Sequence, residues 1–583
     1  MDRPLDRRTI LGEAPLDGAG ALARGADRAR LVRLGPNPFL AARGVESELA
    51  EKRRLIAERC LSFHAQIGYR DPAESRRAYA EIHDRLARHG AAPDRYGICL
   101  DWSMGYPAAQ RPGRPCGTGM ILTGPEDFVA LTAAAPVAPH FGDFVLGMPA
   151  AVENASAALL AGSTTIGNLS QYFTFRLPGW DDDLGTTLAT VEALGLLAAQ
   201  DVRILVHSNL DDGYAAWFED MGSALGFAMV ERWIVEELIG LPLGQCFGHT
   251  FTEPVKRLAF QLALSRVNPT PGTMLYGNTT LYGPEPVANY GALASYLLVD
   301  AFSQWTNPSG HALTPIPVTE AQRIPTVAEI VEAHLAGRRL AERIGDLAPL
   351  LSTAEAGPLA DRLVTTGTRF RDRLMAGLEE GGFDLADPAE MLLALRRIGP
   401  AELERRFGET AAGEAVASSF VDEIETLARR VLAAIPETEK LALARQRPRI
   451  VVATTDVHFY GKRLLTLVLT RLGLDVIDGG VSVDADVLAE RAAAASAEAV
   501  AVSTYNGVAL SFAQKLMGEL SRRKIAPRVF IGGRLNEIMA DAGSSLPVDV
   551  GAEIRQSGAL PCRTVEELVA ALVARTTEEE EGR

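Results

Sequence analysis

The chain has few cysteines, and they are not arranged to bind a metal or to form a disulfide framework. Of its 583 residues five are cysteines, and no two form a CxxC pair. Single scattered cysteines favour neither a zinc site nor a disulfide-rich secreted fold, and they suit a reducing compartment. The five are Cys60, Cys99, Cys116, Cys246 and Cys562.

The sequence also lacks long apolar runs and an excess of positive charge. No stretch reaches about 18 uninterrupted apolar residues, and the N-terminal MDRPLDRRTILGEAPLDG has no apolar signal-peptide core. Lys and Arg total 58 against 74 Asp and Glu, a net charge of -16. That balance argues against general affinity for nucleic-acid phosphates or anionic membrane surfaces. We therefore expect a soluble cytoplasmic protein with neither a nucleic-acid nor a membrane partner.

The sequence pattern of the N-terminal two thirds of the chain changes near residue 96. Residues 1–95 are charged and mostly helical in pattern, which predicts an N-terminal helical extension. Residues 96–345 carry eight short apolar runs that end in polar or Gly-rich turns and alternate with helical patterns. This alternation is typical of a (β/α)8 TIM-like barrel. The runs are YGICLDW, CGTGMILTG, GDFVLGM, STTIGNLS, VRILVHSN, GQCFGHT, GTMLYGN and HALTPIPV.

The C-terminal third predicts a second α/β domain. Residues 346–447 are rich in Ala, Leu, Arg and Glu and indicate a helical connector. Residues 448–575 alternate five strands (RIVVATT, LDVID, AVAVST, RVFIGG, PVDVG) with helices. This pattern favours a doubly wound, flavodoxin-like sheet. The acidic tail 576–583 is expected to be disordered. The predicted fold class is thus α/β, a barrel followed by a doubly wound domain.

The first strand of the C-terminal domain ends in a DxHxxG motif, Asp456, His458 and Gly461. The stretch before it is apolar and β-branched, and KRLLTLVLTRLG after it has helical spacing. Ligands of doubly wound sheets bind at such strand-to-helix turns. One short pattern is weak by itself, because Asp456 could simply cap the helix.

Two further strand ends make the pattern specific. Ser503, Thr504 and Tyr505 end the third strand, with 41 residues between Gly461 and Ser503. Gly532-Gly533 ends the fourth, with 26 residues between Tyr505 and Gly532. The ordered set DxHxxG, SxY and GG resembles the cobalamin-binding domain of B12-dependent mutases and methionine synthase. Tyr505 departs from the usual Leu or Thr, which affects the shape of the binding slot.

The resemblance implies a role for each of these residues. His458 would be the lower axial ligand of cobalt, with Asp456 accepting its other ring N–H. The benzimidazole of the cofactor would then be displaced, hydrogen-bonded by Ser503 and packed against Gly532-Gly533. The implied cofactor-binding residues are Thr455, Asp456, Val457, His458, Phe459, Gly461, Ser503, Thr504, Tyr505, Gly532 and Gly533.

The predicted barrel resembles the catalytic subunit of glutamate mutase. The matching stretches are GMPAAVENASAALLAGSTTIGNLS, VRILVHSNLDDG and HALTPIPVTEAQRIPTVAEI, in the family's order. A barrel before a cobalamin domain in one chain also resembles 2-methyleneglutarate mutase and methylmalonyl-CoA mutase. The resemblance implies an adenosylcobalamin-dependent carbon-skeleton mutase, an isomerase that works by radical hydrogen abstraction and 1,2-group migration, and a homodimer.

The arginine cluster and Glu that hold the substrate in glutamate mutase cannot be mapped onto this sequence. A carboxylate substrate remains reasonable because arginine binds carboxylates bidentately. His207, at a predicted strand end, is the first catalytic candidate, with hydrogen-bonding or acid/base work expected of it. The catalytic candidates are His207, Arg111, Arg114, Asp101 and Arg176, with His249 and Tyr172 second.

Three other functions fit parts of the sequence. A corrinoid methyltransferase would place a compact helical cap before the cobalamin domain, and residues 360–445 could form one. No Cys/His cluster for a zinc-activated thiol accompanies it. A non-catalytic cobalamin sensor or carrier would not need the polar strand ends. A pyridoxal-phosphate aminomutase would need a strand-end lysine, and Lys256 and Lys462 are the few central lysines.

Overall fold

The computed structural model describes residues 4–13, 16–211, 214–409, 413–539 and 545–581. It divides into two compact units. Unit 1 comprises residues 1–114, 119–174 and 181–420, and unit 2 comprises residues 115–118, 175–180 and 421–583. Within the described ranges, no helix is both long and apolar enough to span a membrane.

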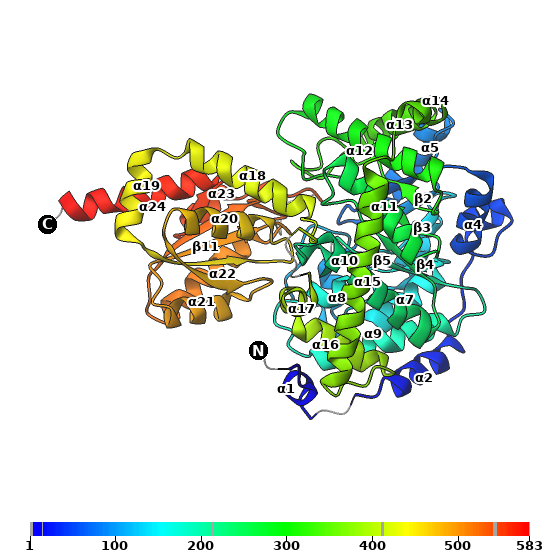
Figure 1. The fold of residues 1–583 in the computed structure, drawn as a ribbon, viewed down its shortest axis with the longest axis horizontal. Helices are drawn as coiled ribbons and strands as arrows, with labels where there is room; N and C mark the ends of the chain where they lie inside the picture. Colours follow the sequence, from blue (N-terminus) through cyan, green and yellow to red (C-terminus); the bar gives the residue numbers. More distant parts are fainter. Residues whose placement is uncertain (1–3, 14–15, 212–213, 410–412, 540–544, 582–583) are drawn as a thin grey trace. The chain divides into compact units, whose positions relative to one another are not determined.

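Unit 1 contains short parallel strands enclosed by helices (Figure 1). The strands form three sheets, β1-β2-β3, β4-β5-β6 and β7-β8. Every pairing within them is parallel. The strands are β1 (His64–Ile67), β2 (Arg95–Ile98), β3 (Ala138–His140), β4 (Thr165–Ile166), β5 (Leu205–Asn209), β6 (Leu243–Cys246), β7 (Met274–Leu275) and β8 (Ala312–Leu313).

Backbone contacts link these sheets to one another. A parallel bridge joins Phe141, after β3, to Ile166 of β4, and another joins Phe63, before β1, to Leu313 of β8. The Tyr276 N–H after β7 donates to the Phe247 carbonyl after β6 at 2.9 Å. Each sheet therefore continues into the next through at least one backbone contact.

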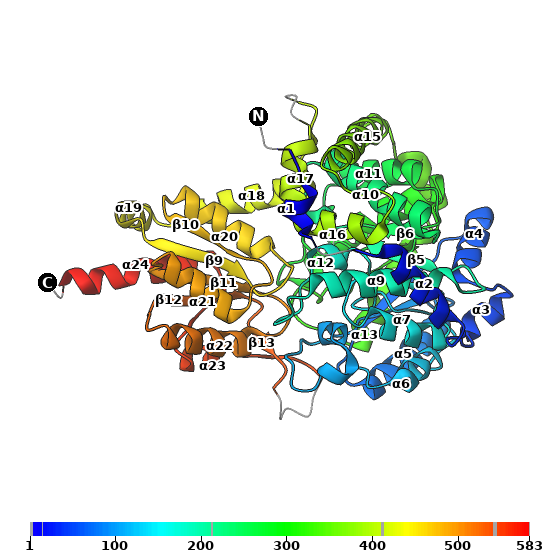
Figure 2. The same ribbon diagram turned by 90° about the horizontal axis from the view of Figure 1, so that it is seen from below.

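Helices follow most strands of unit 1 and cover their outer side (Figure 2). Several begin with a side-chain cap; Thr326 and Glu329 form a reciprocal capping box at α13. The helices are α1 (Arg7–Leu11), α2 (Gly18–Ala29), α3 (Pro38–Arg43), α4 (Glu48–Glu58), α5 (Pro72–Ala87), α6 (Pro125–Thr132), α7 (Ala151–Leu160), α8 (Gln171–Thr174), α9 (Asp183–Ala198), α10 (Met221–Arg232), α11 (Pro254–Val267), α12 (Pro286–Thr306), α13 (Val327–Ala341), α14 (Ile344–Leu347), α15 (Ala356–Glu380), α16 (Pro388–Ile398) and α17 (Pro400–Phe407). Short helical turns are η1 (Trp102–Gly105), η2 (Ala108–Gln110), η3 (Tyr214–Trp217), η4 (Trp233–Ile239) and η5 (Ala348–Leu350).

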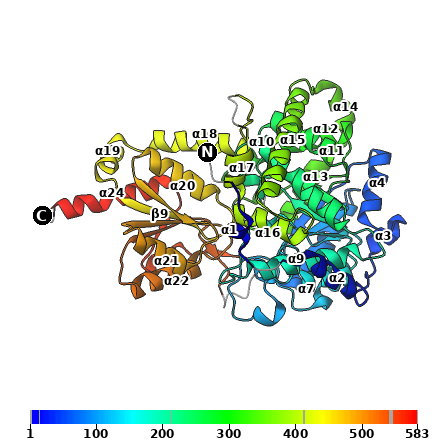
Figure 3. The same ribbon diagram turned by 60° about the horizontal axis from the view of Figure 1, so that its bottom comes forward.

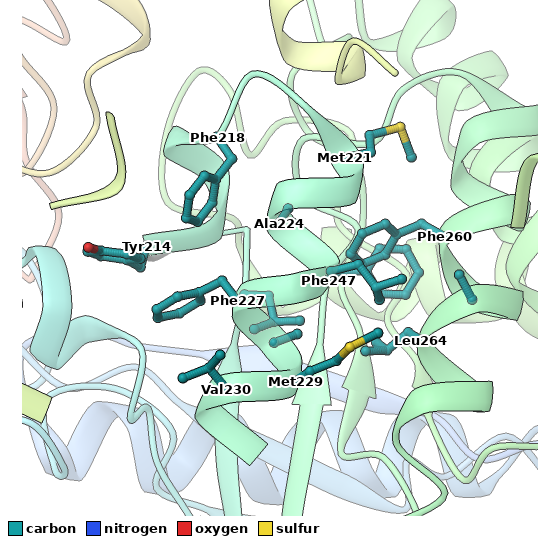
Figure 4. Packing of buried hydrophobic residues seen from close by; sticks show 14 of the residues in the cluster. Tyr214, Phe218, Met221, Ala224, Phe227, Met229, Val230, Phe247, Phe260 and Leu264 are labelled. Atoms are coloured by element: carbon teal, nitrogen blue, oxygen red, sulfur yellow. The ribbon is translucent and has the colours of Figure 1, made fainter. Parts of the chain in front are cut away.

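The largest hydrophobic core of unit 1 centres on α10 and the helices around it. Phe227 of α10 packs edge to face on Phe173, at 5.2 Å between ring centroids, and against Tyr214 at 4.5 Å. Figure 4 shows Phe247, after β6, and Phe260 of α11 close to Met229. Edge-to-face and offset ring packing adds to the burial energy of such a core.

Unit 2 is a parallel sheet with helices on both faces (Figure 3). The strand order β10-β9-β11-β12-β15 is that of a flavodoxin-like doubly wound domain. One core packs the sheet against α21, α22 and α23, and the other packs it against α18, α19, α20 and α24. The sheet strands are β9 (Arg449–Thr454), β10 (Asp475–Gly480), β11 (Ala499–Thr504), β12 (Arg528–Gly533) and β15 (Leu560–Cys562). A short antiparallel pair adds β13 (Asn536–Glu537) and β14 (Val548–Asp549). The helices are α18 (Ser419–Ala434), α19 (Glu437–Gln446), α20 (Tyr460–Arg471), α21 (Ala485–Ala494), α22 (Ala509–Arg522), α23 (Gly551–Gln556) and α24 (Val565–Glu581).

Some predicted strands are wrong. CGTGMILTG contains only the isolated bridge of Met120 to Leu100, and GDFVLGM is a buried irregular segment. Their places are taken by β1, inside the predicted N-terminal extension, and by β3, just before GDFVLGM. In unit 2 the fifth sheet strand is β15 rather than PVDVG, of which Val548 and Asp549 form β14.

The boundaries of the predicted segments also differ from those of the structure. α2 of the expected extension packs so closely on α9 that a Cβ on Gly25 would collide with the Glu192 carbonyl. The expected connector divides at residues 420 and 421, with α14 to α17 in unit 1 and nearly all of α18, together with α19, in unit 2. The expected disordered tail begins inside α24, which continues to Glu581; residues 582 and 583 lie outside the described part.

Candidate functional site

Asp456 organises the loop between β9 and α20. Its side chain is buried, and Oδ1 accepts from the His458 backbone N–H at 2.9 Å and lies 2.7 Å from His458 Nδ1. Oδ2 accepts from the Thr455 hydroxyl at 3.1 Å and from the backbone N–H groups of Tyr505 at 3.0 Å and Asn506 at 3.3 Å. One carboxylate therefore ties this loop to the loop after β11.

The Asp456 carboxylate is held in its charged form. Burial alone would raise its pKa, but hydrogen bonds from the His458 side chain and backbone hold the pKa of Asp456 below its usual value. The His458 side chain is 30% exposed. Its ring packs on Tyr505, with 4.2 Å between centroids. In carboxylate–histidine pairs of this kind, the ring nitrogen that faces away from the carboxylate is the one that binds a metal.

The three motif elements meet at the carboxyl ends of three neighbouring strands of the sheet. In the register of the strands, Ser503 of β11 pairs with Thr454 of β9 on one side and with Gly532 of β12 on the other. Thr504 pairs with Gly533. These residues lie at the carboxyl ends of their strands, where doubly wound sheets bind ligands.

Glycines keep the backbone close at this edge. A Cβ on Gly461, in the first turn of α20, would collide with Ser503 Oγ. Gly533 has φ +90°, and a Cβ there would collide with the Thr504 carbonyl oxygen. Gly461 therefore lies directly against Ser503.

The other predicted cofactor residues flank these contacts. Val457 is partly buried and Phe459 is buried immediately before α20. The Thr504 hydroxyl lies within hydrogen-bonding distance of the carbonyls of Gly532, at 3.2 Å, and Arg534, at 3.0 Å. It therefore also helps to hold the end of β12 beside β11.

Sequence reasoning missed two participants. The guanidinium carbon of Arg534 lies 4.3 Å from the centroid of the Tyr505 ring, which also packs on the His458 ring. Asn506 contributes only its backbone N–H to Asp456. Arg534 directly follows the GG motif, and that position is the signal that could have found it.

This geometry defines a parallel α/β domain with a ligand site at the carboxyl edge of its sheet. Residues 447–557 match the family model described as the B12 binding domain. The C-terminal unit therefore contains a B12-binding domain, and the resemblance inferred from the motifs is confirmed at that level.

The other comparisons add little about function. Among solved structures, one described as a crystal structure of a novel cobalamin-binding protein from Desulfitobacterium hafniense DCB-2 is similar at 19% identity, covering 34% of this chain and 88% of that chain. Its TM-score of 0.20 supports no argument about the fold. No curated protein matches the chain.

The residues present fit a B12 cofactor. The Asp456–His458 pair has the carboxylate–histidine arrangement that orients a metal-binding imidazole. Thr454 Oγ1 and Ser482 Oγ are buried beside the strand edge, without a hydrogen-bond partner among the described residues. Buried orphan hydroxyls of this kind can be satisfied by the polar groups of a ligand.

In unit 1 the structure buries His207, in the middle of β5. Its Nδ1 lies 2.8 Å from His140 Nε2, and its Nε2 lies 2.9 Å from Cys246 Sγ. Burial, together with the charge of Arg95, holds the pKa of His207 well below its usual value, so the ring is neutral. Both ring nitrogens thus contact other side chains of the interior.

The predicted arginines and Asp101 hold loops together. Asp101 caps η1 by accepting from the Ser103 N–H at 2.9 Å, and it accepts from the Gly119 N–H at 3.1 Å. Arg111 donates to the carbonyls of Leu122, Met104 and Tyr106. Arg114 lies 5.1 Å from the centroid of the Tyr106 ring. Asp101, Arg111 and Arg114 share the segment after β2.

Arg176 belongs to unit 2, unlike the other catalytic candidates. Its guanidinium lies 3.2 Å from Asp484 Oδ2 and donates to the Trp180 carbonyl at 3.3 Å. Unit 1 on its own therefore does not gather all the candidates that the sequence predicts.

The second-rank candidates have different surroundings. Tyr172 is fully buried, its hydroxyl lies 2.6 Å from Thr187 Oγ1, and its carbonyl accepts from Arg396. This environment favours packing. His249 follows β6, with Nδ1 3.3 Å from Thr279 Oγ1 and its ring edge-on to Tyr276. His249 thus lies where the carboxyl ends of β6 and β7 meet.

Proposed function

We propose that the protein is an adenosylcobalamin-dependent carbon-skeleton mutase acting on a carboxylic acid or a derivative of one. The observation that carries the proposal is the B12-binding domain with Asp456, His458, Gly461, Ser503 and Gly532 gathered at one sheet edge. Adenosylcobalamin, when bound, supplies the radical that abstracts a substrate hydrogen.

The chain's own part begins with holding the cofactor. In the proposal His458 Nε2 would bind the cobalt of the cofactor, while Asp456 keeps Nδ1 protonated and fixes the plane of the ring. Ser503 and the glycines beside it would hold the nucleotide part of the cofactor.

We further infer that β1 to β8 close into a (β/α)8 barrel. The bridges of Phe63 to Leu313 and of Phe141 to Ile166 support this inference, as does the Tyr276 to Phe247 hydrogen bond. Barrel enzymes work at the carboxyl ends of their strands. His249 and the segment after β2 with Arg114 lie at such ends and are the unit 1 residues proposed to meet the substrate.

The packing of the helices before β9 supports a mutase over a methyltransferase. α15 and α16 contribute Phe370, Leu374 and Leu392 to the main core of unit 1. Of the predicted cap region, nearly all of α18, together with α19, belongs to unit 2. The helices of the predicted cap region are therefore divided between the two units.

The proposal is tested by cofactor preference and by substrate-dependent radical signals. The full chain should bind adenosylcobalamin more tightly than methylcobalamin in absorbance titrations. Linear and branched acids and their thioesters would then be screened anaerobically against the loaded protein by electron paramagnetic resonance. A radical signal that depends on one of these compounds supports a mutase. A protein that ignored adenosylcobalamin and exchanged a methyl group with cob(I)alamin would instead be a methyltransferase.

A further inference from the structure

Two asparagine amides stand at neighbouring strand ends of unit 1 with hydrogen-bonding capacity left over. Asn168 follows β4, and Asn209 is the last residue of β5. Their exposed fractions are 0% and 2%. Among the residues that the structure describes, Asn168 Nδ2 and Asn209 Oδ1 have no hydrogen-bond partner. Leaving a buried polar group unpaired costs about 1–3 kcal/mol, so a pair of them calls for an explanation.

The orientation of the Asn168 amide is fixed by its oxygen. Asn168 Oδ1 accepts from the Asn209 N–H at 2.8 Å, from the Ser170 N–H at 3.2 Å and from the Ser170 hydroxyl at 3.0 Å. Backbone donors identify that atom as oxygen, so the remaining atom is the NH2 group. Asn168 therefore presents a donor, held beside β5, that the fold does not use.

The Asn209 side chain points into the interior of unit 1. Ser208 donates to Glu231 of α10 at 2.5 Å, so position 208 faces the outer helices. His207 faces the opposite way, toward His140 and Cys246. Because side chains alternate along a strand, Asn209 lies on the same side as His207, one step nearer the carboxyl end. The bonds of Asn209 run through its backbone, to Asn168 Oδ1 and from the Ser170 hydroxyl.

The groups next to these amides on the inner side are neutral. Burial, followed by the charge of Arg95, keeps the pKa of both His140 and His207 well below the usual value. Uncharged imidazoles on one side and the unused NH2 group of Asn168 on the other give a site that offers a hydrogen bond without a countercharge. Such a site suits an oxygen that accepts hydrogen bonds, and it does not require that oxygen to be ionised.

We propose that Asn168 Nδ2 donates a hydrogen bond to an acyl oxygen of the substrate, a carboxylic acid or its thioester, at the carboxyl ends of β4 and β5. The Asn209 side chain makes no hydrogen bond among the described residues, so in this proposal its amide turns to donate its NH2 group to the same oxygen. This assignment rests on the proposed function, because it names the part of a mutase substrate that the strand ends recognise. It also accounts for the unused NH2 group of the buried Asn168 side chain as a donor that a ligand completes. Asn209 is the better residue to mutate, because its side chain makes no hydrogen bond among the described residues, whereas the Asn168 amide oxygen accepts three.

The test uses the full chain without cofactor and four probes: butyrate, glutarate and the N-acetylcysteamine thioester of each. Binding is measured by saturation-transfer NMR, and unfolding midpoints by thermal denaturation. Asn209→Leu should weaken the preferred probe about tenfold while the midpoint stays equal or rises, because an unpaired buried amide is replaced by an apolar group of similar size. The control is Asn154→Leu, since Asn154 Nδ2 donates to the carbonyls of Met104 and Phe144. This control should lower the midpoint and leave probe affinity unchanged.

Each outcome decides between the alternatives. Tighter binding of thioesters than of free acids assigns the site to a thioester carbonyl, and the reverse order assigns it to a carboxylate. Equal probe affinity in wild type and Asn209→Leu, or no probe bound by the wild type, overturns the proposal. If Asn209→Leu fails to fold, Asn209→Ser carries the same binding test. A cobalamin titration of the same samples separates this result from the proposed function: intact cobalamin binding with no acyl binding refutes only the acyl site.

Discussion

Replacing Asp456 by asparagine should disable the cobalamin site while leaving its shape nearly unchanged. The carboxylate accepts on both oxygens, from His458 through Oδ1 and from Thr455, Tyr505 and Asn506 through Oδ2. An asparagine side chain has one oxygen and one NH2 group. The NH2 group must therefore face N–H donors on one side, whichever way the amide turns.

The loss can be worked out from these contacts. Either orientation of the amide gives up two backbone or ring N–H bonds to a charged acceptor, each contributing about 1.5–3 kcal/mol. The free energy of unfolding of unit 2 should fall by about 3 kcal/mol or more. The Nδ1 proton of His458 also loses its carboxylate partner, and loss of such a partner weakens metal binding about 10- to 100-fold.

Urea denaturation and absorbance titration with cobalamin measure both effects on the full chain. Asp478→Asn is the matched control, because the Asp478 side chain is 74% exposed and pairs with Lys462 at 2.9 Å. An exposed ion pair contributes at most about 1 kcal/mol. If Asp456→Asn bound cobalamin as tightly as Asp478→Asn does, the role assigned to Asp456 would be wrong.

Three further changes have expected outcomes. Burial raises the pKa of Glu231 to about 7. Stability contributed by this group is complete below its unfolded pKa of 4.5 and is lost as the pH rises through 7, a change of about 3 kcal/mol. Glu231→Gln should therefore flatten the decline of the melting temperature between about pH 5 and 8 in calorimetry, and an unchanged slope would contradict this. Gly533→Ala should destabilise unit 2 by about 2–4 kcal/mol in urea, because φ is +90° and a Cβ meets a carbonyl oxygen; Gly518→Ala, with open space around its Cβ, should stabilise it slightly. Tyr172→Phe should cost about 1 kcal/mol and keep cobalamin affinity, and a loss of affinity would give Tyr172 a role beyond packing.

The cobalamin motif could be predicted because its geometry is local. Asp456 and His458 are two residues apart on a single turn, and the strands on which the motif depends are apolar and β-branched. Their spacing fixes which strand ends carry Ser503 and Gly532. The contact of Asp456 with the Tyr505 backbone could not be read from the sequence, because it joins two separate loops.

The errors in unit 1 arise where the apolar pattern of the sequence does not match its strands. β1 reads HAQI, with polar His64 and Gln66 alternating with Ala65 and Ile67 of the outer core. That pattern has no apolar run to mark a strand. Conversely, Val145 and Leu146 of GDFVLGM are fully buried although they form no strand, because an apolar run signals burial and not a backbone conformation.

The misplaced fifth strand of unit 2 has a different cause. β15 contains Pro561, a residue that argues against a strand in a sequence. The structure places β15 at the edge of the sheet, where proline is tolerated because one side of the strand needs no donor. The contacts of Arg111 were equally hidden, because they depend on which distant backbone carbonyls its side chain reaches.

The most direct test of the central claim is which nitrogen lies on cobalt. The protein would be produced with ¹⁵N-labelled histidine, loaded with unlabelled cob(II)alamin and examined by electron paramagnetic resonance. If His458 is the axial ligand, the hyperfine splitting from that nitrogen changes from the triplets of ¹⁴N to the doublets of ¹⁵N, and His458→Ala abolishes the change. An identical spectrum from labelled and unlabelled protein would mean that the nitrogen belongs to the cofactor, and the account of the site would be contradicted.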